Sequence, residues 1–182
     1  PATSLDGSDF TFVPFGRIHL TMLGIYQFHN AANVLTAIEL LRMKGYTIPD
    51  SAVYEGMARA KWKARFEILS RDPLILYDGA HNPQGIAAAD VNIRRYLTEL
   101  TSSGKIHLLM GVLADKDYRA MIRTLAPYAA HVVTITPSSP RALDASETAA
   151  VFLENGVTAI PAETVAQGVC LAADGAKREK MP

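Results

Sequence analysis

The sequence predicts an α/β protein built on a mainly parallel sheet with flanking helices, preceded by a smaller segment with a different pattern. From about residue 62 onward, short apolar runs alternate with helical patterns, and parallel strands need such crossover helices. Several of these runs are apolar without interruption, which indicates strands buried on both faces. With 182 residues, 49% of them hydrophobic, the chain is long enough for one core and a second small lobe.

The first segment is expected to contain strands followed by two helices. Apolar and polar residues alternate over 9–23, which predicts two short half-buried strands in a hairpin or meander. Residues 30–45 are expected to form a helix ending at Gly45, because apolar residues recur at helical spacing: Ala31, Val34, Leu35, Ile38 and Leu41. A shorter helix is expected over 51–60, and we place a domain boundary near Trp62.

The second segment alternates strand and helix to its end. Two β-like runs, 65–70 and 73–79, precede a helix with one apolar face, made of Ile86, Ala89, Ile93, Tyr96, Leu97 and Leu100. The expected elements that follow are strand 105–112, a helix ending at Pro127, strand 131–136, helix 144–156, strand 157–160 and helix 163–174. Because the sequence stops after that helix, we expect a final strand of the sheet to be missing.

Charge and cysteine content exclude several classes of partner and site. The 18 basic and 18 acidic residues are spread through the chain and give a net charge of +0, so we expect neither a nucleic-acid partner nor a membrane partner. The single cysteine, Cys170, excludes an intrachain disulfide and fits a reducing cytoplasm. The chain opens on Pro1 without an initiator methionine, so we expect a fragment of a longer polypeptide. Four histidines have no metal-like spacing and are assigned no chemistry: His19, His29, His107 and His131.

The stretch LYDGAHNPQG, residues 76–85, ends an apolar strand on a cluster of polar residues. Ligands of open parallel sheets gather at the carboxyl ends of strands, where loops meet helix N-termini. A helix beginning near Pro83 points N–H groups and a positive dipole end toward His81 and Asn82, which suits a phosphate or carboxylate. Asp78 is a good acceptor for ribose hydroxyls. The alternative is that Asp78 and Asn82 only cap the helix while His81 lies on the surface.

Four motifs, in order along the chain, give the sequence a specific resemblance. DGAHNPQG is similar to the signature of folylpolyglutamate and dihydrofolate synthases, a branch of the Mur ligase superfamily. LGIYQFHNAANVLTAIELL is similar to that branch's Gly-x-His-Gln-x-x-Asn-Ala helix start, KWKARFEIL to its Trp-Pro-Gly-Arg-Phe-Glu segment, and GVLADKD with PSSPRAL to its later loops. The resemblance spans roughly residues 10 to 172, and the Asp-Gly-Ala-His-Asn-Pro string favours the folate branch over the peptidoglycan ligases.

The resemblance implies a two-lobed enzyme and a reaction. Residues 1–61 correspond to the C-terminal tail of a central ATPase domain, and 62–182 to a Rossmann-like Mur-ligase C-terminal domain. The complete enzyme, expected to be a monomer, would phosphorylate a folate or dihydropteroate carboxylate with ATP and join it to L-glutamate through the acyl phosphate. The phosphate loop Gly-x-x-x-x-Gly-Lys-Ser/Thr is absent from this sequence, and the Mg²⁺ ligands are expected upstream. We therefore expect the chain to be inactive alone.

The resemblance also assigns roles to single residues. Asn30 matches the asparagine that hydrogen-bonds adenine, with Gln27 one turn earlier near the same edge. Arg65 matches the arginine that reaches the ATP phosphates, where its forked donors could stabilise transferring charge. Asp78 matches the ribose-binding acid, and His81 the histidine near the γ-phosphate and the acyl intermediate. Without the resemblance, Asn30 reads as a helix cap and Arg65 as a strand-edge surface residue.

Other positions carry weaker assignments. Lys116 and Asp117 could help to order the glutamate site, but a solvated charge pair at the start of a helix is the competing interpretation. Arg141 could pair with a carboxylate or be an ordinary loop charge. The sequence departs from the family where Lys63 and Ala64 replace Pro-Gly before the arginine, and where a tyrosine, Tyr26, stands in place of a common histidine. The first departure leaves the placement of the arginine less constrained.

Two other functions compete with the ligase. Lacking the phosphate loop, the chain could be a non-catalytic nucleotide-binding or interaction module. It could also be a dinucleotide-dependent oxidoreductase, but the Gly-x-Gly-x-x-Gly fingerprint is missing, as is the acid about 20 residues further on. We rank the oxidoreductase last.

Overall fold

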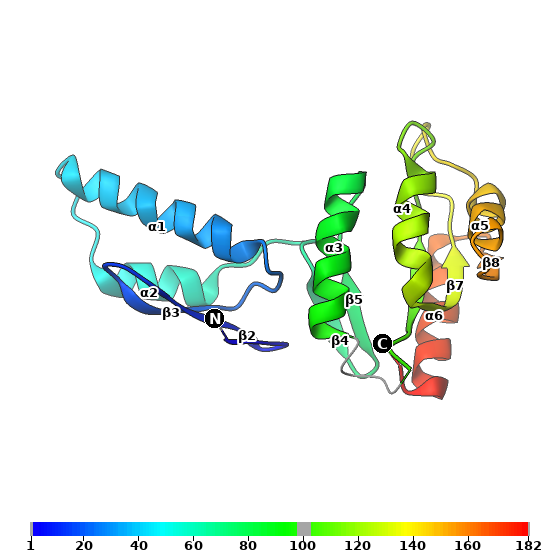
Figure 1. The fold of residues 1–182 in the computed structure, drawn as a ribbon, viewed down its shortest axis with the longest axis horizontal. Coiled ribbons are helices and arrows are strands. Elements are labelled where there is room, and N and C mark those ends of the chain that lie inside the picture. Colours follow the sequence, from blue (N-terminus) through cyan, green and yellow to red (C-terminus); the bar gives the residue numbers. More distant parts are fainter. Residues whose placement is uncertain (1, 98–102, 182) are drawn as a thin grey trace. The chain divides into compact units, whose positions relative to one another are not determined.

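The computed structural model describes residues 2–97 and 103–181 and divides the chain into two compact units, Pro1–Glu67 and Ile68–Pro182. In Figure 1 the first unit runs from blue to cyan and the second from green to red. Among the described residues, no helix is both long and apolar enough to cross a membrane.

The first unit begins with an antiparallel meander of three strands: β1 (Ala2–Ser4), β2 (Gly7–Phe12) and β3 (Gly16–Leu20). Alternation sets the faces of β3, because Ile18 and Leu20 are buried while Arg17 and His19, which alternate with them, are exposed. Gly16 has a φ of +73°, a conformation that glycine adopts freely, and it opens β3 directly after the turn. The predicted meander is confirmed.

Two helices cover this meander. α1 spans Gln27–Met43 and α2 spans Asp50–Arg59, and both predicted helices are confirmed. Their core joins the sheet to both helices through Phe15, Ile18, Leu20, Ala31, Leu35, Val53 and Met57. Val34 and Leu41, expected on the buried face of α1, are instead 50% and 40% exposed. A three-stranded sheet and one short helix cover only a narrow stripe of α1, so part of its apolar surface stays open.

The second unit starts with a strand pair and a helix. β4 (Glu67–Arg71) and β5 (Leu74–Tyr77) pair with each other and are joined by Asp72 and Pro73, a connection short enough only for antiparallel neighbours. The loop after β5 therefore follows a separate two-stranded sheet, whereas the sequence predicted that it follows a strand of the parallel sheet. α3 (Pro83–Tyr96) then buries its predicted face; Leu100, also expected there, lies outside the described residues.

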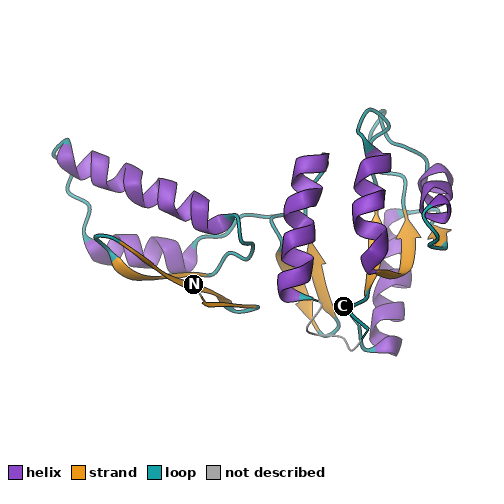
Figure 2. Cartoon of the chain, viewed as in Figure 1, coloured by secondary structure: helices purple, strands orange, loops and turns teal. Residues whose placement is uncertain are grey.

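The remaining strands form the predicted parallel sheet. Its order is β6 (Ile106–Met110), β7 (Ala129–Thr134) and β8 (Ala159–Pro161), all parallel. α4 (Tyr118–Leu125), followed by a 3₁₀ turn (Ala126–Tyr128), crosses from β6 to β7, and α5 (Ala145–Glu154) crosses from β7 to β8. α6 (Val165–Glu179) packs on β6 and β7. Figure 2 shows the alternation of strand and helix, and the α/β fold class is confirmed.

Candidate functional site

A pocket of about 320 Å³ lies inside the first unit, between β3, α1 and α2. Its walls are mostly apolar, with Leu20, Ile38 and Met57 among them. Gln27 and Asn30, the two predicted adenine-binding residues, both line it. Because they lie three positions apart at the start of α1, their side chains share one face of the helix.

The two amides contact each other directly. The Asn30 Nδ2 donates a hydrogen bond of 2.8 Å to the Oε1 of Gln27, whose residue is only 4% exposed. Asn30 itself is exposed, so the pair joins a buried amide to an accessible one. A side-chain amide offers a donor beside an acceptor, the pattern that pairs with the N6 and N7 edge of adenine. The pocket volume also falls within the roughly 300–1,000 Å³ of small-molecule sites.

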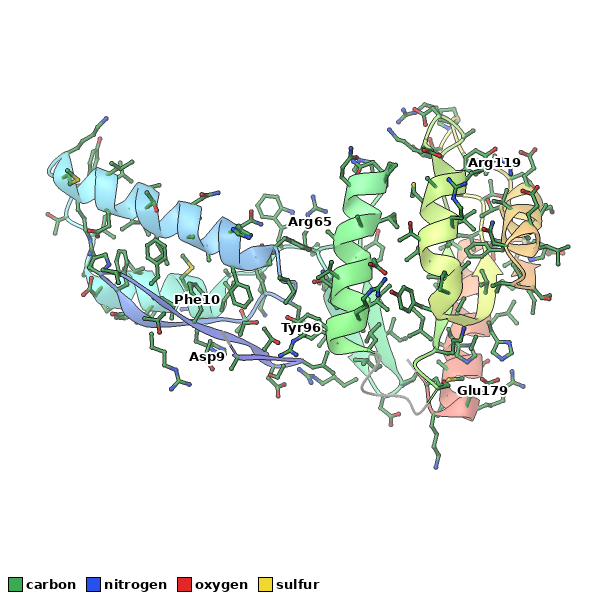
Figure 3. The ribbon with its side chains drawn as sticks, in the orientation of Figure 1. Asp9, Phe10, Arg65, Tyr96, Arg119 and Glu179 are labelled. Atoms are coloured by element: carbon green, nitrogen blue, oxygen red, sulfur yellow. The ribbon has the colours of Figure 1, made fainter. Side chains whose placement is uncertain are left out.

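The segment that carries Arg65 has an unusual backbone. Ala64 and Phe66 have φ values of +56° and +50°, which non-glycine residues rarely adopt. Two features hold the segment in place. The Phe66 side chain is buried, at 3% exposed, and the Ala64 N–H donates a 2.8 Å hydrogen bond to the Oε2 of Glu67. Arg65 is exposed, labelled in Figure 3, and donates through Nη1 to the Ala64 carbonyl at 3.1 Å. It lies before β4 begins, not within a strand as predicted.

The polar loop between β5 and α3 is organised by its own side chains. The Oδ1 of Asp78 accepts a 2.8 Å hydrogen bond from the N–H of Ala80, and the Oδ1 of Asn82 accepts one of 2.7 Å from the N–H of Gly85. Asn82 thus caps α3, as the alternative interpretation proposed, and Pro83 occupies the first helical position as predicted. A side chain on Gly85 would crowd the Asn82 Oδ1, since a Cβ there lies 3.2 Å from it.

His81 lies exposed in the same loop with a fixed ring. Its Nδ1 is 3.0 Å from the carbonyl oxygen of Gly79. A carbonyl only accepts, so Nδ1 carries a proton and the Nε2 edge faces away from this bond. The ring is therefore oriented, yet accessible to a ligand.

The loops after β6 and β7 lie together at the carboxyl edge of the parallel sheet. The N–H of Ala114 donates to the carbonyl of Arg141 at 2.8 Å, and the N–H of Leu143 donates to that of Val112 at 2.9 Å. These bonds join the two stretches GVLADKD and PSSPRAL, which are far apart in sequence. The two motif stretches GVLADKD and PSSPRAL are therefore neighbours in space.

Charged residues in these loops pair with one another. The Nη1 of Arg141 lies 2.8 Å from the Oδ2 of Asp115, and the Lys116 Nζ lies 4.0 Å from the same oxygen. Asp117 caps α4 by accepting from the N–H of Ala120 at 3.2 Å. Asp117 thus starts the helix, as the competing interpretation has it, whereas Lys116 pairs with Asp115 in place of Asp117. Asp115, which joins Arg141 to Lys116, was not singled out from the sequence.

The structure also brings together three residues for which the sequence offered no pattern. His107 and His131 are paired across β6 and β7, and both lie near Glu179 of α6. Their spacing along the chain carries no signal, because strand register and helix packing create the cluster.

Three comparisons with known proteins bear on this arrangement. A family model described as "Mur ligase, glutamate ligase domain" matches residues 64–181. A folylpolyglutamate synthase of Lacticaseibacillus casei is 34% identical over 133 residues, 70% of this chain and 30% of that protein. A UDP-N-acetylmuramyl-tripeptide synthetase of Leifsonia xyli subsp. xyli is 30% identical over 155 residues, 81% of this chain and 29% of that protein.

A solved structure gives the same result. The Mycobacterium tuberculosis folylpolyglutamate synthase complexed with ADP superposes with a TM-score of 0.77 at 26% identity, covering 92% of this chain and 37% of that chain. The chain therefore spans about a third of the length of these relatives, and the resemblance stated from the motifs is confirmed at the level of family and fold.

Proposed function

The chain belongs to the Mur ligase family, and we propose that it supplies the C-terminal lobe of an enzyme that joins L-glutamate to the carboxylate of a folate or dihydropteroate. The observation that carries the proposal is the Gln27–Asn30 amide pair, which lines an apolar pocket of about 320 Å³. The donor and acceptor of the pair support nucleotide use, in the role that the resemblance implies.

The proposal gives the first unit a place in a larger domain. We propose that residues 1–61 are the C-terminal tail of a central ATP-binding domain and that 62–182 form the ligase C-terminal domain. An apolar surface supports this, because four residues of α1 are at least 40% exposed: Val34, Leu40, Leu41 and Met43. Val34 and Leu41, seven positions apart, share one face of the helix, and exposed apolar patches mark interfaces in soluble proteins.

ATP would supply the phosphoryl group that activates the substrate carboxylate, leaving ADP. The chain's own residues would bind and orient. Gln27 and Asn30 would hold adenine, and Asp78 would turn its carboxylate from the Ala80 N–H toward the ribose hydroxyls. The amine of glutamate would then form the amide bond while phosphate leaves with the C–O electron pair and the amine proton passes to solvent.

Two exposed side chains would meet the developing charge. Arg65 presents a guanidinium whose forked donors match phosphate oxygens, and such donors act on charge that grows in the transition state. His81, when protonated, could donate from Nε2 to a phosphate oxygen while Nδ1 keeps its bond to the Gly79 carbonyl. Lys116 and Asp117 would border the glutamate site. They belong to the loop after β6, which is hydrogen-bonded to the loop that carries Arg141.

The one cluster of three potential metal ligands among the described residues does not suit Mg²⁺. The one group of three or more His, Cys, Asp or Glu ligands among the described residues contains two imidazoles, whereas Mg²⁺ prefers carboxylate, carbonyl and water oxygens. We expect the Mg²⁺ ligands on the part of the enzyme outside this sequence.

The nucleotide site can be tested with two asparagines of one helix. Asn30→Ala removes an amide from the pocket, whereas Asn33→Ala removes an exposed amide that does not line it. Titration calorimetry with ADP should show at least about tenfold weaker binding for Asn30→Ala, the equivalent of one or two lost hydrogen bonds. Asn33→Ala should bind as wild type. Equal affinities of all three proteins would contradict the adenine assignment, and binding without ligation in the complete protein would favour the non-catalytic module.

A further inference from the structure

Three metal-ligating side chains converge where β6, β7 and α6 meet. The Nε2 of His107 lies 3.2 Å from one carboxylate oxygen of Glu179, and the Nε2 of His131 lies 3.0 Å from the other. One ligand atom from each residue lies within 4.8 Å of the others. The centroids of the two imidazoles lie 4.9 Å apart with planes 28° from parallel, and each ring presents its Nε2 to the same carboxylate.

The fold builds this cluster from elements far apart in sequence. Parallel pairing sets His107 opposite His131 near the amino ends of β6 and β7. α6 packs across both strands, and its last residue, Glu179, lies beside the two histidines. Gly175 permits that path, because a Cβ there would lie 2.8 Å from the Nδ1 and Cε1 of His107. Figure 3 labels Glu179 at the end of α6.

Both histidine–carboxylate separations fit a small tetrahedral ion. Zinc bonds of roughly 2.0–2.2 Å to nitrogen and oxygen place ligand atoms about 3.3 Å apart, close to the 3.2 and 3.0 Å that separate the two histidines from the Glu179 carboxylate. The His107 side chain is 6% exposed and therefore held in place, whereas His131 and Glu179 are 57% and 38% exposed. An ion can enter from that open side and keep a water in its fourth position.

We propose that His107, His131 and Glu179 bind one divalent first-row transition-metal ion, with Zn²⁺ as the reference member. Two imidazoles and one carboxylate suit zinc, cobalt, nickel or copper, whereas Mg²⁺ and Ca²⁺ prefer oxygen donors. The site lies at the amino edge of the parallel sheet, and the loops that carry Lys116 and Arg141 lie at the carboxyl edge. The ion therefore links the end of α6 to the sheet and takes no part in the joining of glutamate.

The first experiment is calorimetric titration of the metal-stripped full chain with ZnCl₂. We expect one ion per chain and at least about tenfold weaker binding in His131→Ala and in Glu179→Gln, since even outer-shell changes cost 10–100-fold. His19→Ala is the matched control, because His19 also faces a carboxylate, with its Nδ1 3.3 Å from the Oδ1 of Asp9. It should bind zinc as wild type.

Thermal unfolding gives a second readout. At zinc about 100-fold above the dissociation constant, the unfolding midpoint should rise by roughly 5–10 °C, and Mg²⁺ should cause no such rise. His131 and Glu179 are exposed, so both variants should fold, which circular dichroism checks. The proposal is overturned if zinc does not bind, if both variants bind it as wild type, or if Cys170→Ser alone abolishes binding, since Cys170 is exposed on α6.

Discussion

The backbone before Arg65 predicts an unusual response to a glycine substitution. Ala64 has a φ of +56°, and a left-handed conformation costs an L-residue about 1–2 kcal/mol. Glycine carries no such penalty, although it loses roughly 0.4–1 kcal/mol more through the freedom of the unfolded chain. Ala64→Gly should therefore raise the free energy of unfolding by about 0.5–1 kcal/mol. The variant keeps the backbone N–H that donates to the Glu67 carboxylate.

The matched control is the same substitution in a helix of the same unit. Ala37 is exposed in the middle of α1, where replacing alanine by glycine costs about 0.5–1 kcal/mol. The two variants should therefore shift stability in opposite directions. Urea unfolding followed by circular dichroism measures both, and the fluorescence of Trp62, the single tryptophan, reports on the first unit.

A loss of stability in Ala64→Gly as large as that in Ala37→Gly would contradict this expectation. It would mean that Ala64 is not held at positive φ in solution. Arg65 would then not lie on a constrained turn in solution.

Three further outcomes follow from the second unit and from the transition-state roles. Asn82→Ala removes the cap of α3 and should cost about 1 kcal/mol of unfolding free energy, measured by urea denaturation. Burial, and then the hydrogen bond to Asp90, raise the pKa of Tyr128, so the folded state holds its proton more tightly than the unfolded state does. The stability difference between wild type and Tyr128→Phe, about 1 kcal/mol near neutral pH, should persist below about pH 10 and shrink as pH rises through the raised pKa. Arg65→Ala and His81→Ala in the complete protein should each lower turnover at least tenfold, or ~1.4 kcal/mol, and wild-type rates would remove those roles.

Periodicity and capping chemistry predicted most of the fold. The helix that begins at Pro83 follows from an Asn-Pro start signal, and alternation around Gly16 predicts paired strands. These signals are local, so a single sequence carries them. The exposure of Val34 and Leu41 is not local, because it depends on how much of α1 the neighbouring elements cover.

The parts of the candidate site that depend on local sequence patterns were predictable. The contact between Gln27 and Asn30 follows from their helical spacing, and the capping role of Asn82 from its place before Pro83. The Arg141–Asp115 pair and the His107–His131–Glu179 cluster depend on which loops and strands become neighbours. Spacing along the sequence does not predict those contacts.

Glutamate ligation is tested by measuring the incorporation of labelled L-glutamate by the complete protein made from the native gene. The assay supplies ATP with either dihydropteroate or a reduced folate as acceptor. We expect acceptor-dependent incorporation, with one ADP and one phosphate formed per amide bond. Absence of glutamate incorporation with both acceptors, in a folded protein that binds ADP, would contradict it.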